Sequence, residues 1–137
     1  MIILSVDYGD SRTGVAVCDK SEMLASPVGV ISESYEPRLL DKLCEIVKEQ
    51  KPERIVVGLP RNMDGSYGER AEKCTLFSEK LAEASSVETV LWDERLTTVS
   101  AHRALNEVNV RGKKRKNIVD AVAAVMILED YMASRKK

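Results

Sequence analysis

Three apolar segments rich in β-branched residues open the chain, with short polar turns between them. They span residues 2–6, 13–18 and 26–31. Two later segments of the same kind, residues 54–58 and 88–93, each follow a stretch of helical periodicity. Short turns favour antiparallel strands, whereas an intervening helix favours parallel ones. We therefore expect an α/β fold with a mixed sheet, its first three strands antiparallel and its later ones parallel, flanked by helices on both faces.

Helices are expected where apolar residues recur every three or four positions. They are residues 38–50, 69–83, 98–107 and 118–135. With 137 residues the chain has the length of one domain, and residues 1–137 are assigned to a single domain. The longest unbroken apolar run, residues 121–128, is too short to cross a bilayer. The N-terminus lacks the basic region of a signal peptide, so we expect no membrane association and a cytoplasmic protein.

The cysteine and histidine content excludes several kinds of chemistry. The three cysteines are odd in number and far apart, which argues against a disulfide framework and a zinc site. A single histidine argues against a histidine-centred catalytic triad and a multi-histidine metal site. The remaining candidates for chemistry are carboxylates.

Acidic residues stand where burial would be costly. Asp7 closes the first strand, and Asp93 and Glu94 close the fifth. Asp120 is the one polar residue within residues 118–128. Strand ends are where α/β proteins place their sites, so Asp7 and Glu94 converge if the first and last strands both lie near the sheet centre. With Asp120 they would form a hard-oxygen site for Mg²⁺ or Mn²⁺, suited to phosphodiester cleavage.

Each acidic residue also has a purely structural explanation. Asp7 can cap a turn, and Asp93 and Glu94 can pair with a surface cation. Asp120, third or fourth in its expected helix, can be stabilised by the helix dipole. The residue pattern leaves open whether Asp93 or Glu94 is the ligand.

Residues 111–116, with the sequence R-G-K-K-R-K, carry five positive charges directly before the expected last helix. Cations at a helix N-terminus oppose the helix dipole, so local stability does not explain this basic loop. Neutralisation of nucleic-acid phosphates does explain it, and a solvated loop is the alternative.

Four motifs occur in a recognisable order along the chain. They are D-Y-G-D-S-R-T-G-V-A at residues 7–16, G-L-P-R-N-M-D-G at 58–65, D-E-R-L-T-T at 93–98 and K-N-I-V-D-A-V-A-A at 116–124. Together they resemble the YqgF/RuvX family over essentially the whole chain. The resemblance implies an RNase H-like fold with a five-stranded sheet and a metal-dependent nuclease. By motif matching it implies Asp7, Glu94 and Asp120 as the catalytic set, holding one or two Mg²⁺ or Mn²⁺ ions.

The family is described both as a nuclease that matures the 5′ end of pre-16S rRNA and as a Holliday junction resolvase. We expect the first role, with structured RNA such as a ribosomal precursor as substrate, branched DNA as the alternative, and a monomer or homodimer as the active form. Basic side chains would position the phosphates: Arg12, Arg61, Arg95, Arg111, Lys113, Lys114, Arg115 and Lys116.

Two other classes of protein share parts of this pattern. One is a non-catalytic nucleic-acid-binding module of the same fold. The other is a sugar kinase or actin-like ATPase, whose phosphate loop also follows a strand-end aspartate. Such ATPases close two domains around the nucleotide, whereas this chain has the length of one.

Overall fold

Five strands form one mixed sheet in the computed structural model. The structure describes residues 1–60, 68–94 and 113–136; within the last range, side chains are described from residue 122 onward. The strands are β1 (Ile3–Asp7), β2 (Arg12–Cys18), β3 (Ala25–Ser32), β4 (Arg54–Leu59) and β5 (Glu88–Asp93). Their order is β3-β2-β1-β4-β5; β1, β2 and β3 pair antiparallel, and β1, β4 and β5 pair parallel. The expected mixed sheet is confirmed, with β3 at an edge, as Pro27 near its start predicts.

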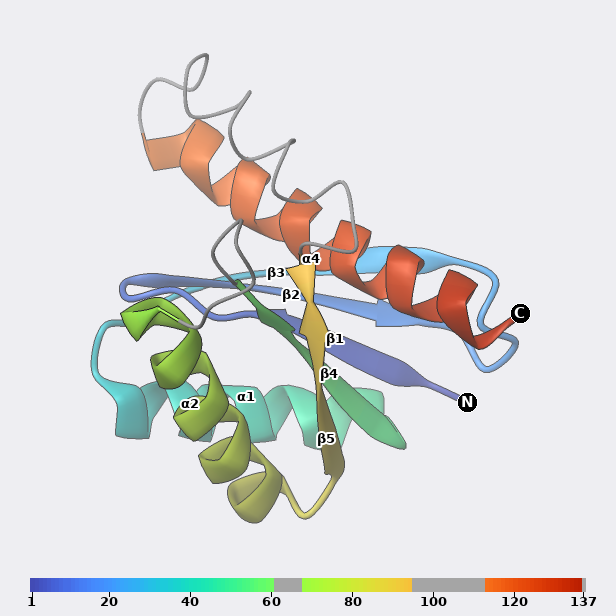
Figure 1. Ribbon diagram of the computed structural model, residues 1–137, viewed down its shortest axis with the longest axis horizontal. Helices are drawn as coiled ribbons and strands as arrows, with labels where there is room; N and C mark the ends of the chain where they lie inside the picture. The colour runs from blue at the N-terminus through green and yellow to red at the C-terminus, as the bar shows by residue number, and fades with distance from the viewer. Residues whose placement is uncertain (61–67, 95–112, 137) are drawn as a thin grey trace.

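Helices cover both faces of this sheet (Figure 1). Those described are α1 (Glu36–Gln50), α2 (Glu69–Ser85) and α4 (Lys113–Arg135). Helices α1 and α2 lie on one face, and α4 crosses the other. None of the described helices combines the length and apolar character needed to span a membrane. The helix expected at residues 98–107 lies outside the described residues.

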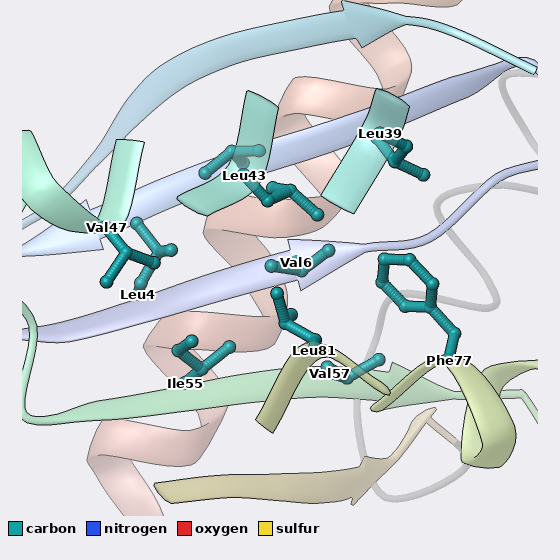
Figure 2. Close-up of a cluster of buried hydrophobic side chains, with 10 residues drawn as sticks. Leu4, Val6, Leu39, Leu43, Val47, Ile55, Val57, Phe77 and Leu81 are labelled. Carbon is teal, nitrogen blue, oxygen red and sulfur yellow. The ribbon is translucent and has the colours of Figure 1, made fainter. Parts of the chain in front are cut away.

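Side chains along β1 alternate between two hydrophobic clusters, as they must in a strand. Leu4 and Val6 face α1 and α2 and belong to one cluster with Leu39 of α1 (Figure 2). Ile3 faces α4 and packs with the alanines and aliphatic residues of that helix. Asp7 is four residues after Ile3, so its side chain points to the same face of the sheet, the face covered by α4.

The helices on the opposite face bury the residues that their periodicity predicts. The α2 stripe of Ala71, Cys74, Phe77 and Leu81 is buried throughout. Pro37 lies in the first turn of α1, where the missing backbone N–H has no helical partner in any case. These two helices therefore hold the central strands from one side and leave the other side to α4.

The start of the last helix differs from the expectation. Helix α4 begins at Lys113, so the interpretation of residues 111–116 as a loop is wrong for residues 113–116, which are helical. Lysine and arginine are good helix formers, and a cation near a helix N-terminus costs only about 0.3–1 kcal/mol, so helix propensity outweighs the dipole here. Asp120 is consequently the eighth residue of α4, beyond the first turn in which the dipole acts.

Candidate active site

Asp7 is the last residue of the central strand and is buried, with 6% of its surface exposed. It pairs with Gly14 of β2, and its neighbour Val6 pairs with Val57 of β4. These ladders on both sides hold the end of β1 rigidly. A carboxylate buried at such a place is costly unless hydrogen bonds, a counter-charge or a bound cation compensate it.

Glu94 reaches the same face from the edge of the sheet. The condition stated for their convergence, that the first and last strands both lie near the sheet centre, holds for β1 but not for β5, because β4 separates β1 from β5 and β5 is an edge strand. The Glu94 carboxylate lies against Gly58 of β4: a Cβ on Gly58 would stand 2.9 Å from Glu94 Oε1 and 2.6 Å from Ile127 Cδ1. Val6 pairs with Val57, so the next residues of the two strands, Asp7 and Gly58, lie opposite each other. Their backbones are separated by about 4.8 Å, the spacing of neighbouring strands.

The strand alternation separates Asp93 from Glu94. Trp92 packs in the cluster under α4, whereas Leu91 packs in the clusters under α1 and α2. Asp93 is two residues after Leu91, so the two side chains point to the same face of the sheet. Asp93 also pairs with Leu59 of β4, which packs against α2. Asp93 therefore belongs to the α2 side of the sheet, and Glu94, which is 3% exposed, shares the face of Asp7.

Helix α4 brings position 120 to the same level. Its C-terminal part lies at the start of β4, where Tyr131 accepts a 2.9 Å hydrogen bond from the first residue of that strand, so α4 runs antiparallel to β1 and β4. Ser5 Oγ donates a 2.7 Å hydrogen bond to the carbonyl of Ala124. Asp7 lies two residues beyond Ser5 along β1, a rise of about 6.6 Å. Asp120 lies four residues before Ala124 along α4, a rise of about 6.0 Å in the same direction. The backbone of Asp120 is therefore level with Asp7.

The basic residues expected to bind phosphates are described only in part. Arg12 is the first residue of β2. Every second residue of a strand points to the same face, and Ala16 and Cys18 pack under α4, so Arg12 lies on the same face as Asp7. The other expected residues are Arg61, Arg95 and Arg111, which lie outside the described residues, and Lys113, Lys114, Arg115 and Lys116, whose backbone alone is described.

Two residues near the site were not identified from the sequence. One is Gly58, whose motif could shape a substrate-facing loop or a turn by its sequence, but whose closeness to Glu94 was not predicted; it lies inside β4. An isolated glycine within a β-rich run marks a close approach of another group, so this signal was available. The other is Arg70, the second residue of α2, whose guanidinium donates a hydrogen bond to the carbonyl of Tyr8. Only the tertiary structure shows that contact.

The donor set fits a hard divalent cation. The carboxylates of Asp7 and Glu94 are buried on one face, at the ends of the two strands that flank β4. Oxygen donors of this kind suit Mg²⁺ or Mn²⁺ better than zinc. Among the described side chains, which do not include that of Asp120, no three histidine, cysteine or acidic side chains gather as a metal-binding group.

Comparison with known proteins points to one family. Residues 1–134 match the family described as RuvX: Holliday junction resolvase. The chain is 42% identical over 137 residues to a Bacillus cytotoxicus protein named "Putative pre-16S rRNA nuclease", covering 98% of this chain and 100% of that protein. A Ruminiclostridium cellulolyticum protein of the same name is 42% identical over 133 residues, covering 96% of this chain and 94% of the relative.

Solved structures share the fold at lower identity. RuvC of Thermus thermophilus in complex with a Holliday junction substrate matches with a TM-score of 0.60 and 15% identity, covering 99% of this chain and 96% of that one. The fowlpox virus Holliday junction resolvase matches with a TM-score of 0.54 and 14% identity, covering 98% and 99%. The expected RNase H-like fold is therefore confirmed.

Proposed function

This chain belongs to the RuvX family, and from that premise we propose that it is a divalent-metal-dependent nuclease that matures the 5′ end of pre-16S rRNA in the cytoplasm. One observation supports the proposal most strongly: two buried carboxylates from different strands share one face of the sheet, next to the helix that carries a third. Asp7 and Glu94 are the two, and Asp120 is the third.

The scaffold explains how such a site would be held. Asp7 is paired with β2, its neighbour Val6 is paired with β4, and Glu94 lies in the space that Gly58 leaves on β4. The hydrogen bond from Ser5 ties α4 to β1 one helical turn from Asp120. Rigid positioning of ligands is what a hydrolytic metal site requires.

These residues would bind one or two Mg²⁺ or Mn²⁺ ions, which supply activation of a water molecule and stabilisation of the leaving oxygen. The role of Asp7, Glu94 and Asp120 is to provide oxygen ligands in a fixed arrangement. Arg12, on the same face, would hold a substrate phosphate together with the basic residues near the start of α4. Burial of both carboxylates strengthens their interaction with a cation, because water screens it less.

The choice of substrate rests on the relatives. Those at 42% identity carry the name of a pre-16S rRNA nuclease, which favours structured precursor RNA. The family description names a Holliday junction resolvase, so branched DNA is the second candidate. Both reactions hydrolyse phosphodiester bonds, and the same carboxylates would serve either one.

A cleavage assay with Mg²⁺ or Mn²⁺ tests the proposal, using a pre-16S rRNA fragment, single-stranded RNA and DNA, and a four-way DNA junction. Asp7→Asn, Glu94→Gln and Asp120→Asn should each abolish cleavage. Asp93→Asn is the matched control, because its carboxylate is adjacent in sequence but lies on the opposite side of the sheet. We expect the control to cleave like the wild type.

The results distinguish the alternatives. Preferred cleavage of the rRNA fragment supports rRNA maturation, and preferred cleavage of the junction supports resolution. Metal-independent binding without cleavage of any substrate, unchanged by Asp120→Asn, would identify a non-catalytic binding module. Cleavage retained in Asp7→Asn would refute the assignment of the site.

A further inference from the structure

The backbone leaves the sheet directly after Asp7. The last pair between β1 and β2 is Asp7 with Gly14, and the last pair between β1 and β4 is Val6 with Val57. Neither ladder continues to Tyr8. The peptide that follows Asp7 is therefore held by contacts outside the sheet, and these contacts add to the restraint that the ladders place on Asp7.

Arg70 holds these residues from the start of α2. Its guanidinium donates hydrogen bonds to the carbonyl oxygen of Tyr8 and, at 2.8 Å, to Asp10 Oδ1. The guanidinium carbon also lies 5.1 Å from the centre of the Tyr8 ring. One side chain thus contacts the backbone, the ring and the carboxylate of a three-residue segment. The fork of the guanidinium makes this possible, because it directs several donors in one plane.

Tyr8 is held from its other sides as well. Its ring stacks on Phe77 of α2 with centroids 4.0 Å apart and planes inclined by 3°. Its hydroxyl donates a 3.2 Å hydrogen bond to Glu36 Oε2 at the start of α1. Arg70 and Phe77 contact the ring too, so Tyr8 is an anchor and not a stacking surface for a base. Because Tyr8 directly follows Asp7, these contacts of the Tyr8 side chain with α1 and α2 restrain the peptide that joins the two residues.

Helix stability does not account for Arg70. It is the second residue of α2, where a cation opposes the helix dipole. Its ion pair with Asp10 involves a carboxylate that is 74% exposed, and such pairs contribute little to stability. The interaction that remains is the contact with the Tyr8 carbonyl, one residue from Asp7.

We propose that Arg70 is a positioning residue of the acidic site, which sets the orientation of Asp7 through the backbone of Tyr8. This inference rests on the proposed function of the site. Residues that hydrogen-bond a metal ligand directly typically contribute about 10–100-fold to metal affinity or activity, and Arg70 acts through the adjoining backbone, so the lower end of that range applies. Arg70→Ala is therefore expected to weaken Mn²⁺ binding by about that factor, even without nucleic acid.

The experiment measures Mn²⁺ binding to the full chain by electron paramagnetic resonance, which detects the free ion. Arg70→Ala is compared with wild type, with Asp7→Asn and with Arg38→Ala. Arg38 is the matched control: its guanidinium carbon lies 5.2 Å from the Tyr35 ring centre and it pairs with Glu33 at 4.0 Å, so these contacts do not include Tyr8 or Asp10. Added guanidinium ion should restore part of the Mn²⁺ affinity of Arg70→Ala and none of that of Asp7→Asn.

If Arg70→Ala does not fold, Arg70→Lys decides the question. Lysine keeps the charge but lacks the guanidinium fork, and we expect its Mn²⁺ affinity to fall about threefold or more, the equivalent of one hydrogen bond. Thermal melting of each variant separates this effect from a loss of folding.

Two results would overturn the proposal in different ways. Unchanged Mn²⁺ affinity in the arginine variants, with affinity lost in Asp7→Asn, would refute the role of Arg70 alone. Weaker RNA binding in that case would identify Arg70 as a direct phosphate contact. Wild-type protein that binds no Mn²⁺ in the presence or absence of RNA would refute the proposed function itself.

Discussion

Substitution of Gly58 by alanine tests the geometry of the site most directly. The added Cβ would stand 2.6 Å from Ile127 Cδ1 and 2.9 Å from Glu94 Oε1. Ordinary van der Waals contact begins at 3.4 Å, so the carboxylate oxygen must move by about 0.5 Å and the methyl group by about 0.8 Å. Both are the far ends of flexible side chains, so the chain can still fold.

The two displacements have different consequences. Overpacking against Ile127 should lower the free energy of unfolding by about 1–3 kcal/mol. Displacement of Glu94 should weaken metal binding, because functional groups must be held to within about 0.5 Å, and a misplacement of about 1 Å can cost on the order of 100-fold in rate. For half that displacement we expect about a tenfold loss of Mn²⁺ affinity and of cleavage.

Calorimetric titration with Mn²⁺ and urea denaturation measure the two effects separately. The double variant Gly58→Ala with Ile127→Val removes the methyl group that clashes most closely but leaves Glu94 displaced. It should recover most of the lost stability and little of the lost affinity. Wild-type Mn²⁺ affinity in Gly58→Ala would refute the reasoning, because Glu94 would then not be a ligand in the arrangement described.

Further predictions concern the supports of the site and the ends of the fold. Ser5→Ala removes the buried hydrogen bond to α4 and should cost about 1 kcal/mol in urea denaturation, whereas an unchanged midpoint would contradict the role given to that bond. Gly9→Ala makes the added Cβ clash with the backbone oxygen of Arg12, so the β1–β2 turn must rearrange and the melting temperature should fall clearly, with wild-type melting as the contrary result. Arg135 donates a 2.8 Å hydrogen bond to Glu22 and lowers the pKa of that carboxyl from 4.5 to about 2. The resulting stability is present above pH 4.5 and is lost as the pH falls toward 2, so thermal melts should show a shallower acid dependence in Glu22→Gln than in wild type.

Much of the fold follows from local patterns in the sequence. The alternation of β-branched runs and helical stretches predicts the mixed sheet, and the stripe from Ala71 to Leu81 predicts the buried face of α2. These predictions succeed because the period of the apolar residues is a property of the segment itself. The expected start of the last helix at residue 118 is wrong, because α4 begins at Lys113. Helix propensity and the helix dipole oppose each other there, and the difference between their free energies is small.

The sequence by itself determined the strand-end position of Asp7, the oxygen chemistry of the candidate ligands, and the motifs that place the chain in its family. The tertiary structure decided which of Asp93 and Glu94 shares the face of Asp7, because the face of a residue depends on strand register. It also decided that β5 is an edge strand, so that Glu94 approaches Asp7 across Gly58. Strand order, and the gap that one glycine leaves between two strands, arise from contacts between distant segments, which no local pattern encodes.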